Sequence, residues 1–190
     1  MAHKGICEIL FKDSVVIPSV RNVDDFKFAL SHTQSGSIIL LFGDIIILPS
    51  ILQEAKKYNK RVLVHLDLIG GIGKDRSGIR YLARLGVNSA ITTKPQLVKF
   101  AREEGMIVIQ RLFVMDSEAL KSGINLLKSC NPDAVEVLPA SIPKTIIDEL
   151  VKEIGLPVLA GGLMHTMEDI KAALSNGVQV VSTSKKELWY

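Results

Sequence analysis

Residues 157–184, PVLAGGLMHTMEDIKAALSNGVQVVSTS, contain the clearest pattern of secondary structure in the chain. This stretch starts as an apolar run that stops at Gly161 and Gly162, continues as the helical pattern of residues 166–177, and ends in a second apolar run at residues 178–184. Continuous apolar runs joined by an amphipathic helix are typical of parallel strands in a sheet that helices cover. The stretch therefore predicts one strand, its crossover helix and the next strand.

The same pattern of a strand followed by a helix recurs along the whole chain. The apolar runs predict strands at residues 15–20, 37–42, 61–68, 88–93, 106–113, 134–139, 157–162 and 178–184. Eight such units predict a compact (β/α)8 TIM-barrel-like single domain over residues 1–190, with an open, doubly wound sheet as the alternative. In a barrel, the carboxyl ends of the strands and the loops after them form the functional face.

Composition and charge exclude several classes of protein. The chain is 47% hydrophobic with a formal net charge of +3, which is mild for a nucleic-acid-binding protein. The most apolar segment, residues 37–52, is divided by Gly43 and Asp44 into halves too short to cross a membrane. The amino-terminal residues lack the pattern of a secretory signal. We therefore expect a soluble, cytoplasmic protein without a membrane partner.

The strongest functional signal lies after the last two predicted strands. Strand seven ends in Gly161 and Gly162, and strand eight ends in Ser182, Thr183 and Ser184. Loops at these two positions of a barrel often bind phosphate, and glycine amides, hydroxyls and a helix start provide the donors. The capping-box spacing of Ser184 and residue 187 predicts such a helix start. The alternative is that the glycines merely permit a tight turn.

A second polar pair closes the third strand. His65 and Asp67 are two residues apart and therefore lie on the same face of an extended chain. They could perform acid/base chemistry, supply two metal ligands, or form a polar network at the top of the barrel. No second pair of this kind accompanies them, so we predict no metal centre.

The middle strands end in further polar residues. Lys94, Gln110 and Arg111 follow or end strands four and five, and the two cations are candidates to bind an anion. Glu136 lies within an apolar strand, where an unpaired charge is costly, so it should meet a cation or a ligand hydroxyl. The alternative for each is an internal salt bridge. No Ser-His-Asp arrangement is evident, and no catalytic residue is assigned.

Lysines form two small basic groups. Lys56, Lys57 and Lys60 lie near one predicted helix end, and Lys185 and Lys186 follow strand eight. These side chains could contact RNA phosphates, whereas the alternative is an ordinary solvated helix face.

Several motifs in order along most of the chain resemble a single family. They are VIPSVR (residues 16–21), LVHLDLIGGIGKD (63–75), TTKPQLV (92–98), IQRLFVMDSEAL (109–120), PDAVEVLPA (132–140), AGGLM (160–164) and VVSTSKKELW (180–189). The family is that of the glycerol-3-phosphate-responsive antiterminators, which regulate glycerol-uptake operons. The chain departs from the expected pattern at Met164 and His165, where an aliphatic and a basic residue are expected.

The resemblance implies a TIM-barrel-like regulator that senses glycerol 3-phosphate and binds the leader of an mRNA so that no terminator forms. It implies no turnover and no cofactor, and it leaves the oligomeric state, including a homo-oligomer, open. The ligand-binding positions carried over are His65, Asp67, Lys94, Gln110, Arg111, Glu136, Gly161, Gly162, Ser182, Thr183 and Ser184. The competing hypothesis is a TIM-barrel enzyme that acts on a small phosphorylated substrate, because fold alone does not define function.

Overall fold

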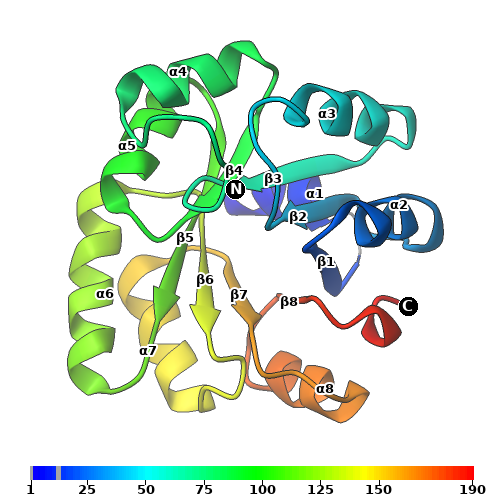
Figure 1. Ribbon diagram of the computed structural model, residues 1–190. Coiled ribbons are helices and arrows are strands. Elements are labelled where there is room, and N and C mark those ends of the chain that lie inside the picture. The colour runs from blue at the N-terminus through cyan, green and yellow to red at the C-terminus, as the bar shows by residue number, and fades with distance from the viewer. Residues whose placement is uncertain (1, 12–13) are drawn as a thin grey trace.

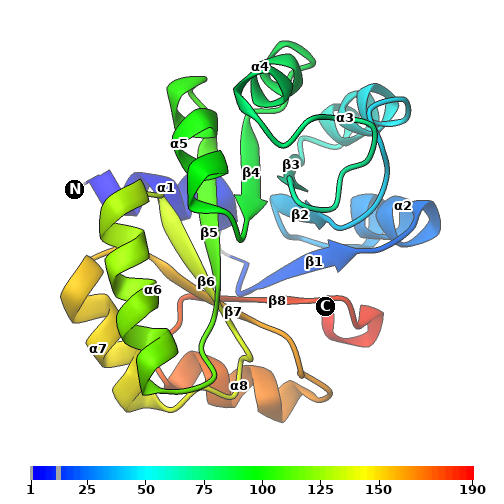
Figure 2. The ribbon, with the colours of Figure 1, turned by 60° about the vertical axis from the view of Figure 1, so that its left-hand side comes forward.

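Eight parallel strands close into a barrel in the computed structural model, which describes residues 2–11 and 14–190 (Figures 1 and 2). Each strand pairs with its neighbours in chain order, and β8 pairs with β1. The strands are β1 (Val16–Val20), β2 (Ser37–Leu40), β3 (Arg61–His65), β4 (Ser89–Thr92), β5 (Ile107–Phe113), β6 (Ala134–Leu138), β7 (Val158–Gly161) and β8 (Val180–Thr183). Every strand lies within a predicted run, so the closed barrel is confirmed and the open sheet is wrong.

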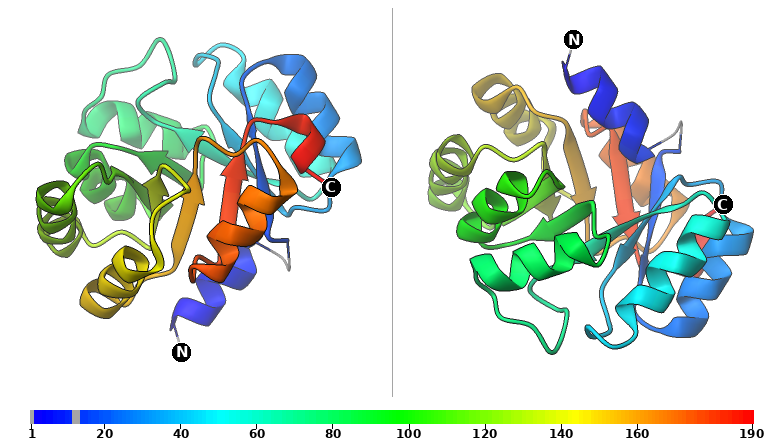
Figure 3. Two further views of the ribbon diagram at one scale, coloured as in Figure 1. Left: turned by 90° about the horizontal axis from the view of Figure 1, so that it is seen from below. Right: turned by 90° about the horizontal axis from the view of Figure 1, so that it is seen from above.

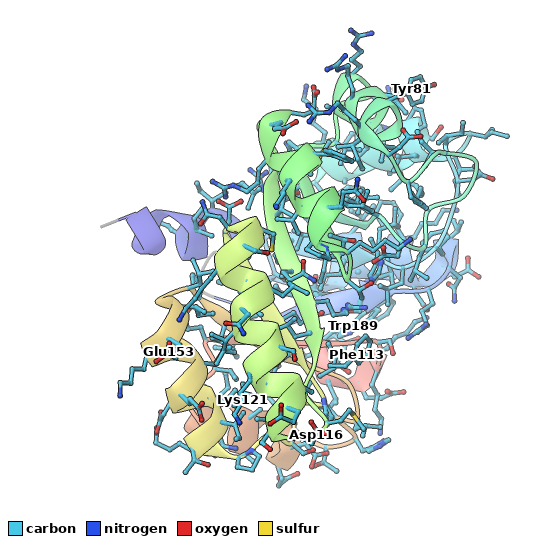
Figure 4. All side chains as sticks on the ribbon, turned by 90° about the vertical axis from the view of Figure 1, so that its left-hand side faces the viewer. Tyr81, Phe113, Asp116, Lys121, Glu153 and Trp189 are labelled. Atoms are coloured by element: carbon cyan, nitrogen blue, oxygen red, sulfur yellow. The ribbon has the colours of Figure 1, made fainter. Side chains whose placement is uncertain are left out.

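Helices alternate with the strands and cover the outside of the barrel (Figure 2). They are α2 (Val23–His32), α3 (Leu48–Lys57), α4 (Arg76–Arg84), α5 (Pro95–Glu103), α6 (Ser117–Cys130), α7 (Lys144–Ile154) and α8 (Met167–Ser175). Local sequence explains their ends. Asp116, at the start of α6 (Figure 4), accepts the Ala119 N–H with its carboxylate at 2.8 Å. Helix α5 begins at Pro95, where a missing N–H costs nothing.

The chain ends in η1 (Lys186–Leu188), a single 3-10 turn. The predicted capping box at Ser184 is wrong, because Lys185 is the N-cap and no side chain caps the turn. Instead the turn is held by Trp189, which is buried and whose indole Nε1 donates to the Thr183 carbonyl at 2.8 Å.

Two apolar layers stabilise the fold. The larger layer lies between the barrel and its helices. The smaller layer fills the barrel and consists of Leu10, Phe11, Ile17, Ile39, Leu63, Ile91, Ile109, Ala134, Leu159 and Val180. Because strand side chains alternate between faces, residues two positions further along each strand also point inward, at the carboxyl end. That position holds Leu41 after β2 and Thr93 after β4, and Ser19, His65, Arg111, Glu136, Gly161 and Ser182 in the other six strands, so the barrel interior becomes mostly polar towards its carboxyl end.

An additional helix, α1 (Ala2–Phe11), precedes the barrel and was not predicted. Leu10 and Phe11 join the cluster inside the barrel, and the Ser37 hydroxyl donates to the Leu10 carbonyl at 2.5 Å. Since Ser37 starts β2, α1 closes the amino-terminal end of the barrel, next to the tails of the strand arrows in Figure 3. In the part of the chain that the structure describes, no helix is long and apolar enough to span a membrane.

Candidate functional site

A cavity of about 310 Å³ opens at the carboxyl end of the barrel. It lies where the sequence predicts a phosphate site, after strands β7 and β8, and extends to the ends of β1, β2, β5 and β6. Its lining residues are Ser19, Arg21, Leu41, Arg111, Leu138, Gly162, Leu163, Met164, His165, Ser182, Thr183, Ser184 and Lys185. The structure therefore brings Gly162, Arg111 and residues 182–184 together around a single space.

The charges and donors of this cavity suit an anion. Arg21, Arg111 and Lys185 line it, and no Asp or Glu is among the described residues that do so. Within residues 14–190, the backbone N–H groups of Leu163 and Ser184 have no intramolecular hydrogen-bond partner. Unpaired N–H groups and cations around a cavity of this kind favour a bound phosphate or carboxylate.

The floor of the cavity is a buried ionic network. Glu136 is 0% exposed, and its two carboxylate oxygens accept from Arg111 Nε and from the Ser182 hydroxyl, each at 2.5 Å. The Arg111–Glu136 pair is the internal salt bridge that the sequence left open as an alternative. It also satisfies the prediction that Glu136 meets a cation, so its carboxylate is occupied without a ligand.

Gly161 is required by this network. A Cβ at residue 161 would lie 2.5 Å from the Ser182 hydroxyl and 3.0 Å from Glu136 Oε1. Gly162 is favoured for a different reason: its φ of +78° lies in the left-handed region, which glycine adopts without strain. Together with Leu163, whose φ is +57°, it forms the turn that leads out of β7. The glycine pair therefore combines close packing below the cavity with a left-handed turn at its edge.

Arg111 connects the network to the cavity. An arginine side chain has five N–H donors in a planar fork. The Nε–H of Arg111 binds Glu136, which leaves the two terminal amino groups available to a ligand in the cavity that Arg111 lines. Glu136 thus fixes the orientation of the guanidinium before any ligand arrives.

His65 has a buried ring nitrogen without a hydrogen-bond partner among the described residues. It is 3% exposed, and its Nδ1 makes no hydrogen bond with the described residues; the nearest carboxylate oxygen, Asp67 Oδ2, is 3.6 Å away. Burial and the nearby Arg111 cation lower the pKa of His65 to about 4, although Asp67 opposes this shift. The imidazole is therefore neutral at pH 7.

The Asp67 carboxylate forms hydrogen bonds with residues at the end of β4. It accepts the Thr92 hydroxyl at 3.0 Å and the Thr93 N–H at 2.8 Å. These bonds join the end of β3 to the end of β4. The structure thus supports the polar-network interpretation of the pair at residues 65 and 67. Among the described residues, no three His, Cys, Asp or Glu side chains form a group that could hold a metal.

Six of the eleven predicted ligand-binding residues do not line the cavity: Glu136 and Gly161 lie beneath it, His65 and Asp67 lie at the end of β3, and Lys94 and Gln110 lie further away. Gln110 is adjacent to the inward-facing Arg111, so the alternation of the strand turns its side chain outward, towards Cys130 on α6. Lys94 is exposed at the start of α5 and does not line the cavity. Conversely, the sequence did not predict the contributions of Ser19 and Arg21, although Arg21 directly follows β1 and could have been found by its strand-end position.

The five lysines predicted to contact RNA do not form one surface. Lys56, Lys57 and Lys60 lie at the end of α3 and before β3, at the amino-terminal end of the barrel, whereas Lys185 and Lys186 follow β8 at the opposite end. Most already have partners. Lys57 binds Glu54, Lys60 donates to the Thr33 and Ser35 carbonyls, Lys185 donates to the His165 carbonyl, and Lys186 binds Asp25.

The fold is thus a TIM barrel, and a cavity lined by cations lies after its last two strands. The chain belongs to the family of glycerol-3-phosphate responsive antiterminators, whose family model matches residues 16–189. This match confirms the family that the motifs predicted.

Two solved structures and one curated protein are similar over most of their length. The glycerol uptake operon antiterminator regulatory protein from Listeria monocytogenes str. 4b F2365 has a TM-score of 0.86 and 30% identity, covering 93% of this chain and 95% of that one. A glycerol uptake operon antiterminator-related protein from Thermotoga maritima MSB8 has a TM-score of 0.81 and 29% identity, with 92% and 96% coverage. The uncharacterized protein YgcP of Escherichia coli K12 is 30% identical, with 95% and 94% coverage.

Proposed function

We propose that this chain is a glycerol-3-phosphate-sensing transcription antiterminator that binds the leader mRNA of glycerol-uptake genes in the cytoplasm. The observation that carries the proposal is the cavity after β7 and β8, which is lined by cations and hydroxyls and by no described carboxylate, in a member of this family. A doubly charged phosphate matches such a lining.

The effector is proposed to bind with its phosphate against the N–H groups of Leu163 and Ser184 and between Arg111 and Lys185. Its hydroxyls then meet the polar floor formed by Ser19 and Ser182, which line the same space. Glu136 supports this arrangement indirectly, because it holds Arg111 in place and keeps the Ser182 hydroxyl oriented.

A sensing role, and no turnover, is favoured by the state of the acidic groups. Glu136 is bound by Arg111 and Ser182, and Asp67 is bound by the end of β4. Neither carboxylate is among the residues that line the cavity. The alternative, an enzyme on a small phosphorylated substrate, rests on His65, which is neutral and lacks a partner for Nδ1.

Regulation follows if effector-bound and effector-free forms differ in RNA affinity. An effector shifts a conformational equilibrium only by its differential affinity for the two states. Binding at the β7–β8 loops would favour the state that retains the leader RNA and thereby prevents terminator formation.

The experiment uses the single tryptophan as a reporter. Trp189 Nε1 donates to the Thr183 carbonyl, one residue from Ser184, so its fluorescence should respond to a ligand in the cavity. Titration with glycerol 3-phosphate should give a saturable change, whereas glycerol and inorganic phosphate, which each carry half of the ligand, should bind far more weakly. Binding of fluorescein-labelled leader RNA, followed by anisotropy at fixed salt, should then tighten with the effector. RNA affinity that is the same with and without effector would contradict the proposal, and release of a product from glycerol 3-phosphate would favour the enzyme.

A further inference from the structure

A second and larger cavity, of about 660 Å³, lies at the opposite end of the barrel. It is bounded by α1, α3, the start of β3 and the turn after α4. Its lining residues are Ile9, Gly36, Pro49, Leu52, Gln53, Ala55, Lys56, Asn59, Lys60, Arg61, Val62, Leu85, Gly86 and Asn88. Nothing in the proposed effector site uses any of these residues.

The charged residues that line this cavity all carry one sign. They are Lys56, Lys60 and Arg61, and none of the described lining residues is acidic. Lys60 is held by the Thr33 and Ser35 carbonyls, and Arg61 donates to the Asn88 side chain at 2.9 Å. These two cations are therefore fixed in place and give the cavity a permanent positive potential that favours an anion.

Lys56 and its neighbour Lys57 differ in their position relative to the cavity. Both are exposed in the last turn of α3, but Lys57 lies 2.6 Å from the carboxylate of Glu54 and does not line the cavity. Lys56 lines the cavity, and its ammonium has no ion-pair or hydrogen-bond partner among the described residues. It is the cation at this end of the barrel that is best placed to bind an incoming phosphate.

The remaining lining is suited to a nucleobase. Leu52 and Leu85 provide apolar surface on α3 and after α4. The Gln53 amide can both donate and accept hydrogen bonds, and Asn88, whose Oδ1 accepts from Arg61, can donate from its Nδ2. A flat apolar ring with polar edges and an attached phosphate matches this combination of walls, amides and cations.

We infer that this cavity binds one nucleotide of a single-stranded RNA, with the phosphate at Lys56 and the base between the leucines. The inference rests on the proposed function, since it places the RNA contact of the antiterminator at the end of the barrel opposite the effector. A free nucleotide would offer the same chemistry, so the test separates the two. Strand β3 runs from this cavity towards the effector end of the barrel: Arg61 at its start lines this cavity, and His65 at its end is close enough to Arg111 to be influenced by its charge.

The test compares Lys56→Glu with the matched control Lys57→Glu. Anisotropy with fluorescein-labelled leader RNA at fixed salt and saturating glycerol 3-phosphate should show a Kd about tenfold or more weaker for Lys56→Glu and within about threefold of wild type for Lys57→Glu. A third variant, Gln53→Phe, leaves the charge and the single tryptophan unchanged and fills the cavity from the exposed face of α3; it should weaken RNA binding as well. Effector binding, read from Trp189 fluorescence, should be unchanged in all three and shows that each is folded.

The other possible outcomes contradict either the RNA contact at this cavity or the proposed function itself. Equal losses in the two lysine variants, or no loss in Lys56→Glu, overturn the cavity as the RNA contact and leave the proposed function standing. Absence of RNA binding by the wild-type protein overturns both. Saturable binding of uridine monophosphate that does not compete with the leader RNA overturns the RNA assignment in favour of a free nucleotide.

Discussion

The Ser182 hydroxyl on β8 donates a hydrogen bond of 2.5 Å to the buried carboxylate of Glu136 on β6. This bond passes Gly161 on the strand between them, where a side chain would collide with it. With Arg111 on its other oxygen, Glu136 is fully engaged beneath the candidate effector cavity. The cavity and its support are thus one unit, and substitutions in the support should affect both stability and effector affinity.

Removing the charge of Glu136 should destabilise the fold. Glu136→Gln leaves the Arg111 cation without its buried partner, and breaking a buried pair costs about 3–5 kcal/mol. Urea unfolding should therefore show a loss of about 3 kcal/mol. Glu153→Gln is the control, because Glu153 is exposed on α7 (Figure 4). It pairs with Lys128 at 2.7 Å on the surface, so its loss should leave stability nearly unchanged. Equal effects of the two variants would show that the buried pair has no special role.

Adding one methyl group at residue 161 should also be costly. In Gly161→Ala the new Cβ would lie 2.5 Å from the Ser182 hydroxyl, so Ser182 or Glu136 must move, at about 1–3 kcal/mol. Gly5→Ala is the contrasting change, since its Cβ meets nothing within 4 Å and α1 gains about 0.5–1 kcal/mol from alanine. Thermal unfolding of both variants measures this, and an unperturbed Gly161→Ala would refute the steric argument.

Stability should depend on the protonation of His65. The pKa is about 4 in the folded protein and about 6.5 in an unfolded chain, so the unfolded state binds more protons between these values. The contribution is fully present above pH 6.5 and falls as the pH decreases towards 4, by about 3 kcal/mol in total. In His65→Gln this part of the pH dependence should disappear. Denaturant unfolding of both proteins from pH 7 to pH 4 gives the difference, and parallel curves would contradict the assignment.

Effector affinity should depend on Lys185 more than on Lys186. Lys185 lines the cavity, so Lys185→Gln should weaken glycerol 3-phosphate binding about tenfold through the loss of a charged hydrogen bond. Lys186 pairs with Asp25 at 2.5 Å and packs over the Phe28 ring, outside the cavity lining, so Lys186→Gln should leave the affinity within about twofold. Calorimetric titration provides the measurement. A stronger effect at residue 186 would place the phosphate elsewhere.

The barrel could be predicted from the sequence because its signal is local and repeated. Each strand lies in a mainly apolar run, and several helices begin at residues such as Pro95 and Asp116 that favour a helix start. Helix α1 was missed because it stands outside this alternation and is stabilised by contacts of Leu10 and Phe11 with strands far along the chain.

The cavity lies at the strand ends where the sequence predicts a phosphate site, and five of the eleven predicted ligand-binding residues line it. Strand ends bring Arg111, Gly162 and residues 182–184 together, as expected. Gln110 was wrongly placed because its chemistry was considered without the alternation that turns it away from Arg111. The partners of the lysines, and the cavity beside Lys56, depend on which loops meet in space, and no local pattern carries that information.

The position of β3 has a consequence for signalling. Its two ends, Arg61 and His65, are four residues apart, which is about 13 Å at the rise of an extended strand. Coupling between effector binding and RNA binding would therefore need to extend only over the length of one strand, within a single layer of hydrogen-bonded strands. Such a regulator needs neither a hinge nor a second domain. Its switching would appear as small changes in how rigidly the strands are held and in the mobility of the loops at the two ends of the barrel.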